Sequence, residues 1–89
     1  MTAGEVLSAN GYDDVIVFEN YSYDDALVGV TSDSRAVYDY DKMVKWLVEK
    51  HGFSTMGAIE WIDYNTIRAL PYYGDRVPVV IHRLDGVYG

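Results

Sequence analysis

The sequence predicts an α+β protein: an antiparallel sheet of three to four strands, a helical hairpin packed on one face of that sheet, and a short N-terminal helix. Two observations predict this class. Short β-branched and aromatic runs, such as residues 15–18 and 77–84, are bounded by charged or turn-forming residues, as strands are. Residues 41–70 instead place apolar side chains at the 3.6-residue spacing of helices.

The N-terminal segment carries the sequence signals of a short helix. Thr2 and Glu5 have the spacing of a capping box, in which each side chain bonds a backbone N–H of the first helical turn. Asn10 and Gly11 follow, and these residue types commonly end helices. We therefore expect a helix over residues 3–9.

Three strands are expected next. The run VIVF at residues 15–18 reads as a buried strand because it is β-branched and aromatic. Residues 26–31 and 35–40 flank the turn-forming residues Ser32, Asp33 and Ser34, so this pair predicts a hairpin. Together they would form three antiparallel strands.

Two helices should follow as a hairpin. Either Asp39 or Asp41 can cap a helix that ends at Gly52. Ser54 or Thr55 opens a second helix, whose apolar period continues to residue 70 and which Pro71 ends. The short connection between the helices predicts antiparallel packing.

The C-terminal part is expected to contain a loop at residues 71–76 and a last strand at residues 77–84. Pro78 near the start of that strand suits a strand terminus or a sheet edge. The tail at residues 85–89 should be frayed.

Length and composition limit the class of protein. The 89 residues are enough for a single domain, 1–89, near the size at which partner binding or self-association often adds stability. The chain has no cysteine, which excludes disulfides and thiolate catalysis and suits a reducing cytoplasm. It has neither a signal-peptide pattern nor 18 consecutive apolar residues, so we expect a cytoplasmic protein that does not bind membranes.

Acidic residues are concentrated in the first part of the chain. Residues 1–41 hold nine acids and one base and carry −8, whereas residues 42–89 hold five acids and six bases and carry +1. Because nucleic-acid backbones are bound by Lys and Arg, this surplus disfavours direct nucleic-acid binding and favours a basic protein partner. The simpler explanation, that negative charge keeps a small protein soluble, stays open.

Acids and tyrosines occur together around the predicted hairpin, and we expect them to form a partner-binding surface. Asp39 and Asp41 would lie about 6.6 Å apart on one face of a strand, close enough to imitate two adjacent phosphates. Tyrosine is enriched at protein interfaces. The predicted partner-binding residues are Asp24, Asp25, Asp33, Asp39, Asp41, Tyr21, Tyr23 and Tyr40. The alternative is that the aspartates cap helices and the tyrosines pack in the core.

No motif predicts catalysis, a metal or a cofactor. His51 and His82 lack the spacing of a metal-binding pair, and the serines and glycines form neither a nucleophile elbow nor a phosphate-binding loop. The acid pair Asp24 and Asp25 lacks the glycine and terminal glutamate of an EF-hand. We therefore expect a protein that is not an enzyme and has no cofactor and no metal.

The stretch from Gly29 to Tyr72 resembles a group of small, mostly uncharacterised acidic proteins carried by phages and mobile elements of Gram-positive bacteria. The segments AVYDYDKMV at 36–44 and WIDYNTIRALPY at 61–72 are the most distinctive, and the resemblance spans residues 12–81. The resemblance implies a setting in which small acidic proteins often inhibit host defence, as anti-CRISPR and anti-restriction proteins do. It implies no catalytic residue.

Residues and resemblance together predict an inhibitor of host defence from a phage or mobile element. It would act in the host cytoplasm by binding the basic nucleic-acid groove of a nuclease such as Cas9 through an acidic, tyrosine-rich surface. The alternative is an accessory or regulatory protein of a mobile element that self-associates, as a homodimer through an exposed strand edge or an aromatic helix face, without imitating nucleic acid.

Overall fold

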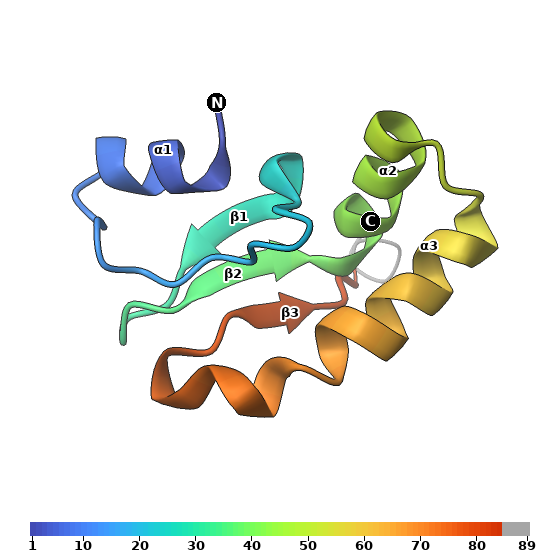
Figure 1. Cartoon of the computed structure of the whole chain (residues 1–89). Coiled ribbons are helices and arrows are strands. Elements are labelled where there is room, and N and C mark those ends of the chain that lie inside the picture. The colour runs from blue at the N-terminus through green and yellow to red at the C-terminus, as the bar shows by residue number, and fades with distance from the viewer. Residues whose placement is uncertain (85–89) are drawn as a thin grey trace.

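The computed structural model describes residues 1–84, so the tail expected to fray at 85–89 lies outside the described residues. One sheet contains β1 (Leu27–Val30), β2 (Ala36–Asp39) and β3 (Val79–Ile81), in that order. The helices are α1 (Ala3–Ala9), α2 (Tyr40–His51) and α3 (Thr55–Trp61), with the short helices η1 (Asp24–Ala26), η2 (Ile62–Ile67) and η3 (Leu70–Arg76). Figure 1 shows α2 and α3 beside each other beyond one end of the sheet and α1 above β1. The α+β class is confirmed.

The sheet combines one antiparallel and one parallel pair of strands. β1 and β2 form the expected hairpin, with Leu27 opposite Tyr38 and Val30 opposite Ala36. β3 runs parallel to β2, with Val80 opposite Tyr38, so the antiparallel expectation holds for the first pair only. The chain between β2 and β3 passes through α2, α3, η2 and η3, and parallel strands need such a long crossover (Figure 1).

The helix ends follow from local sequence signals. The capping box of Thr2 and Glu5 starts α1 as expected. Asp39, one of the two expected caps, accepts a hydrogen bond from the Lys42 backbone N–H and starts α2. Gly52 ends α2 in the left-handed conformation at φ 71°, where a glycine pays no steric penalty. Ser54 caps α3, completing the predicted helical hairpin.

Three local expectations are wrong. Residues 15–18 are not a strand: Val15 and Phe18 are buried as expected, but the Phe18 N–H donates to the Tyr38 hydroxyl at 3.4 Å instead of a neighbouring strand. Residues 71–76 are not a loop but most of η3, a 3₁₀ helix kinked at Gly74. The helix expected up to residue 70 is also interrupted, because α3 passes into η2, a turn of π-helix.

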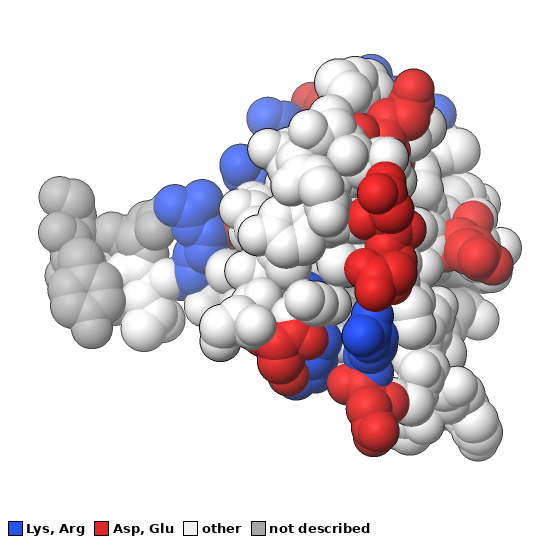
Figure 2. All heavy atoms as spheres, turned by 90° about the vertical axis from the view of Figure 1, so that its left-hand side faces the viewer, with Lys and Arg blue, Asp and Glu red and all other residues white. Residues whose placement is uncertain are grey.

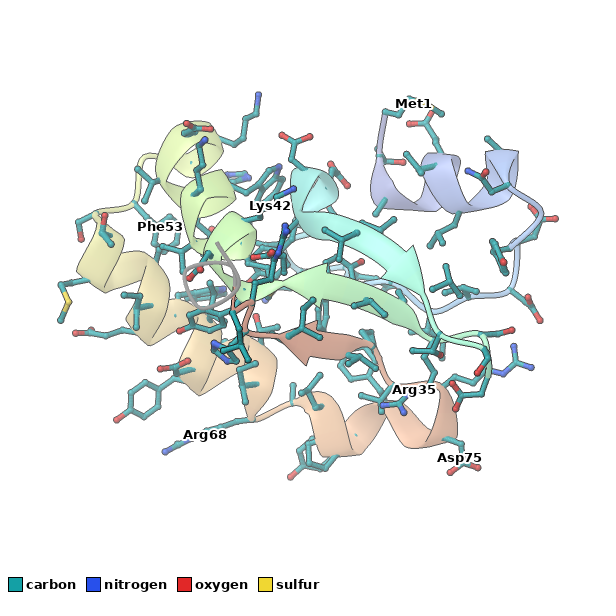
Figure 3. All side chains as sticks on the ribbon, turned by 180° about the vertical axis from the view of Figure 1, so that it is seen from behind. Met1, Arg35, Lys42, Phe53, Arg68 and Asp75 are labelled. Carbon is teal, nitrogen blue, oxygen red and sulfur yellow. The ribbon has the colours of Figure 1, made fainter. Side chains whose placement is uncertain are left out.

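The core lies on one face of the sheet. Ala36 and Tyr38 point from β2 into a cluster that includes Phe18, Tyr23 and Leu47, all of them buried. The chain between α1 and η1 crosses this face (Figure 1). Figure 3, seen from behind, shows that no helix of residues 1–84 crosses the opposite face. In the part of the protein that the structure describes, helices and connecting chain therefore cover one face of the sheet and not the other. Within the sheet, β1 is an edge strand.

Candidate protein-binding surface

Asp39 and Asp41 do not form the expected pair on a strand. β2 ends at Asp39 and α2 begins at once, so Asp41 lies in the first helical turn. Asp39 is only 2% exposed, and its second carboxylate oxygen lies 3.6 Å from the Arg83 guanidinium. The prediction that Asp39 contacts a partner is wrong, because the residue is buried and its two carboxylate oxygens already bond the Lys42 N–H and pair with Arg83. Asp41 is exposed.

The three remaining aspartates lie at two ends of β1. Asp24 is half-buried in η1, where it accepts the Ala3 backbone N–H at 2.8 Å and so fastens α1. Asp25 beside it is exposed. Asp33 lies in the turn after β1 and accepts the Thr31 hydroxyl, which lowers the pKa of Asp33. The five predicted acids therefore do not form one stripe.

Tyr21 and Tyr23 belong to the interior packing. Tyr23 is 1% exposed, and its hydroxyl lies 2.7 Å from Thr66 Oγ1, so the prediction that it contacts a partner is wrong. Tyr21 is half-buried among aromatic rings and makes edge contacts with Trp61 at 5.3 Å and with Phe53 at 5.8 Å between ring centroids. These contacts fix the segment before η1 against the helical hairpin.

Tyr40 is half-buried at the start of α2. Its hydroxyl donates to Asp63 at 2.9 Å, and its ring centroid lies 4.5 Å from that of His82. Burial, together with the Asp63 carboxylate, raises the pKa of Tyr40 to about 12. Tyr40 thus joins α2 to η2 and to the residue after β3.

The change from an acidic to a neutral part of the chain occurs at Arg35, earlier in the sequence than the expected boundary after residue 41, and it is more complete. Residues 1–34 contain seven acids and no Lys or Arg, whereas residues 35–89 contain seven acids and seven bases, so the whole net charge of −7 belongs to residues 1–34. We call residues 1–34 the base-free region. It comprises α1, η1, β1 and their connections. The sequence shows that Arg35 is the first basic residue, but it does not show that this residue lies between β1 and β2.

Arg35 marks the end of this region structurally as well. Its Nε donates to the Val77 carbonyl at 2.8 Å, which attaches the turn after β1 to the start of β3. Figure 3 shows Arg35 at one end of the sheet and Lys42 at the other, where α2 begins. The nearest bases in sequence therefore stand at the two ends of β2.

Acidic groups are prominent on the side of the molecule where α1 ends. Figure 2 shows them in a column on this face, with a basic group between two of them. One acid of the base-free region, Asp14, is paired: Arg76 Nη1 lies 2.9 Å from it, and this hydrogen bond lowers the pKa of Asp14. Both side chains of that pair are largely exposed, so the pair contributes little stability.

A groove runs between α1 and β1, and we call it the α1/β1 groove. Its volume is about 300 Å³. Val6 and Leu7 of α1, Tyr12 and the residues of β1 line it, so its lining comes entirely from the base-free region. No segment of residues 1–84 pairs with the outer edge of β1, the side that faces away from β2. Sequence reasoning did not identify this groove.

Other kinds of site were sought in the described part of the chain. Residues 1–84 contain no group of three or more His, Asp or Glu side chains placed to hold a metal ion. Within the same residues, every helix is too short or too polar to span a bilayer. The groove and the charge of the base-free region are thus the features that bear on binding.

Comparisons with known proteins add no family to this description. Protein-family models, curated proteins and solved structures were all compared with the chain, and none of them matches.

Proposed function

We propose that this protein is a non-enzymatic inhibitor of host defence from a phage or mobile element, which acts in the host cytoplasm by binding a basic protein. The concrete target is the nucleic-acid groove of a nuclease such as Cas9. The observation that carries the proposal is the base-free region: seven acids without a single Lys or Arg, spread over elements that adjoin one another.

The physical basis is electrostatic steering followed by occlusion. A negatively charged region raises the rate of association with a positively charged protein surface. The same charge repels nucleic acid. A nuclease groove built to bind phosphates presents such a cationic surface. The acids that contact it are the exposed ones, such as Asp13, Glu19 and Asp25, in place of the buried Asp39.

The test uses a purified Cas9-type nuclease with its guide RNA and target DNA. We expect added protein to block cleavage and to compete with guide RNA or DNA for the nuclease. Inhibition should weaken strongly between about 0.1 M and about 1 M NaCl, because the Debye length falls from about 10 Å to about 3 Å. Cleavage that is unaffected at the lower salt concentration, with no complex formed, would contradict the proposal.

A second candidate function is self-association, and the observation that favours it is the outer edge of β1, with which no strand among residues 1–84 pairs. Pairing two copies there would bring two base-free regions together, each with seven acids, so charge repulsion opposes it. Sedimentation at both salt concentrations separates the candidates. A monomer is expected, and a dimer present at low salt would favour the accessory role.

A further inference from the structure

We propose that the α1/β1 groove receives an extended, basic segment of the partner protein, which adds to the sheet as a new strand along the outer edge of β1. The inference rests on the proposed function, since it specifies how the basic partner is held. Strand addition supplies affinity through backbone hydrogen bonds and specificity through alternate side chains.

The backbone of β1 offers hydrogen-bonding groups at its outer edge. Thr31 donates its N–H to the Arg35 carbonyl at 2.8 Å, which makes these two residues a hydrogen-bonded pair. Pairs alternate along an antiparallel ladder, so the next pair, Val30 and Ala36, is not hydrogen-bonded. The N–H and C=O of Val30 consequently point away from β2, toward the side on which a new strand would lie.

β1 also lacks two common features that protect an edge strand. Natural edges are often blocked by Lys or Pro, but β1 reads Leu-Val-Gly-Val. Val28 is 42% exposed, and Gly29 beside it has no side chain, with no heavy atom from beyond its two chain neighbours within 4 Å of the position that a β-carbon would take. The backbone is therefore accessible to another chain, although the register irregularity between Leu27 and Gly29 limits pairing to a short stretch.

The far side of the groove is a fixed apolar wall. Leu7 buries its side chain in the core, and the Ala3 N–H is bonded to Asp24, so α1 is held at both its start and its middle. Val6 and Tyr12 remain partly exposed toward the groove. A volume of about 300 Å³ is at the small end of binding pockets and suits a few side chains of a strand.

The residues that line the groove carry no charge, but the elements that form it and the segments next to them carry exposed acids, and these favour a basic occupant. Glu5 lies on α1, Asp13 in the loop after it and Asp25 just before β1, and all three are exposed. Alternate residues of a strand point to opposite sides, so an added strand with alternating apolar and basic residues would place apolar side chains in the groove and Lys or Arg near these acids. A second copy of this chain would bring only further acids, because its β1 region contains no base.

The test measures binding of a peptide of about eight residues, a usual strand length, in which Lys and Val alternate. A matched peptide has Glu in place of Lys. We expect the Lys peptide to bind and to shift the backbone amide resonances of β1 and α1 in isotope-labelled protein. The Glu peptide should not bind. Resonance shifts confined to α3 or η3 would overturn the inference.

Two variants test the groove, and one matched variant serves as the control. Val30→Pro removes the outward N–H without removing a hydrogen bond to β2, and Val6→Lys adds a charge to the groove without touching the β1 backbone. Met56→Lys makes the same charge change on α3, at a side chain that is 66% exposed. We expect the first two to weaken peptide binding at least about tenfold, which is about 1.4 kcal/mol, and the third to have a smaller effect.

The same variants separate this inference from the proposed function. If the wild-type protein inhibits the nuclease and the folded Val30→Pro and Val6→Lys variants inhibit it equally well, strand addition is wrong while the inhibitor function stands. If the wild-type protein binds the Lys peptide but no nuclease, the groove is correct and the proposed function fails.

Discussion

At the scale of single residues, Asp39 shows why an acid in an acidic segment need not be a surface feature. It ends β2, caps α2 through the Lys42 N–H and pairs with Arg83. The sequence could predict the cap, because an aspartate before an amphipathic run is typical of one. The sequence could not predict that Asp39 is buried, since an exposed capping aspartate and a buried one have the same local sequence pattern.

Replacing Asp39 should therefore change stability more than binding. Asp39→Ala removes the cap acceptor and should lower the free energy of unfolding by about 1–2 kcal/mol, whereas Asp39→Asn keeps a capping oxygen and should lower it less. Asp41→Ala, at an exposed position in the first turn of the same helix, is the matched control and should cost under about 1 kcal/mol. Urea unfolding followed by circular dichroism gives the three values. Equal losses for Asp39→Ala and Asp41→Ala would contradict the structural role of Asp39.

At the scale of secondary-structure elements, η2 is joined to the rest of the fold by a buried hydroxyl pair. Tyr23, just before η1, meets Thr66 of η2 at 2.7 Å, although 43 residues separate them in the chain. Burial raises the pKa of Tyr23, which favours its neutral hydroxyl as a hydrogen-bonding group. The pair holds the segment that leads into β1 against the π-helical turn.

This pair can be tested by a double-mutant cycle. Thr66→Val and Tyr23→Phe each remove one hydroxyl and leave the other without this partner, so each should lower the free energy of unfolding by about 1–3 kcal/mol. The double variant leaves no unsatisfied hydroxyl, and its loss should be clearly smaller than the sum of the single losses. Additive losses would show that the two hydroxyls do not interact.

The elements differ in how far the sequence could predict them. α1, α2 and α3 depend on caps and stops within a few residues, such as Thr2 with Glu5, and these signals are local. Residues 15–18 form no strand although their sequence is strand-like, and the Phe18 N–H bonds the hydroxyl of Tyr38, a partner 20 residues away that no local signal identifies. The parallel direction of β3 likewise depends on where the crossover delivers the chain.

At the scale of the whole molecule, charge is partitioned by element. The base-free region carries all of the net charge of −7, and residues 35–89 are neutral in sum. The sequence alone revealed the excess of acid, but not that α1 and β1 would enclose a groove within it, because α1 and β1 are brought together by the Asp24 contact across 21 residues. The candidate surface therefore combines a charge pattern that is visible in the sequence with a groove that is visible only in the fold.

If the base-free region attracts the partner, two variants with the same net charge should bind it at different rates. One neutralises three exposed acids inside the region (Asp13→Asn, Glu19→Gln, Asp25→Asn), and the other neutralises three exposed acids outside it (Glu49→Gln, Glu60→Gln, Asp75→Asn). Both change the net charge from −7 to −4. The measurement is the association rate with the Cas9-type nuclease at low salt. We expect at least about a tenfold loss in the association rate for the first variant and a much smaller loss for the second. Equal losses for the two variants would contradict it.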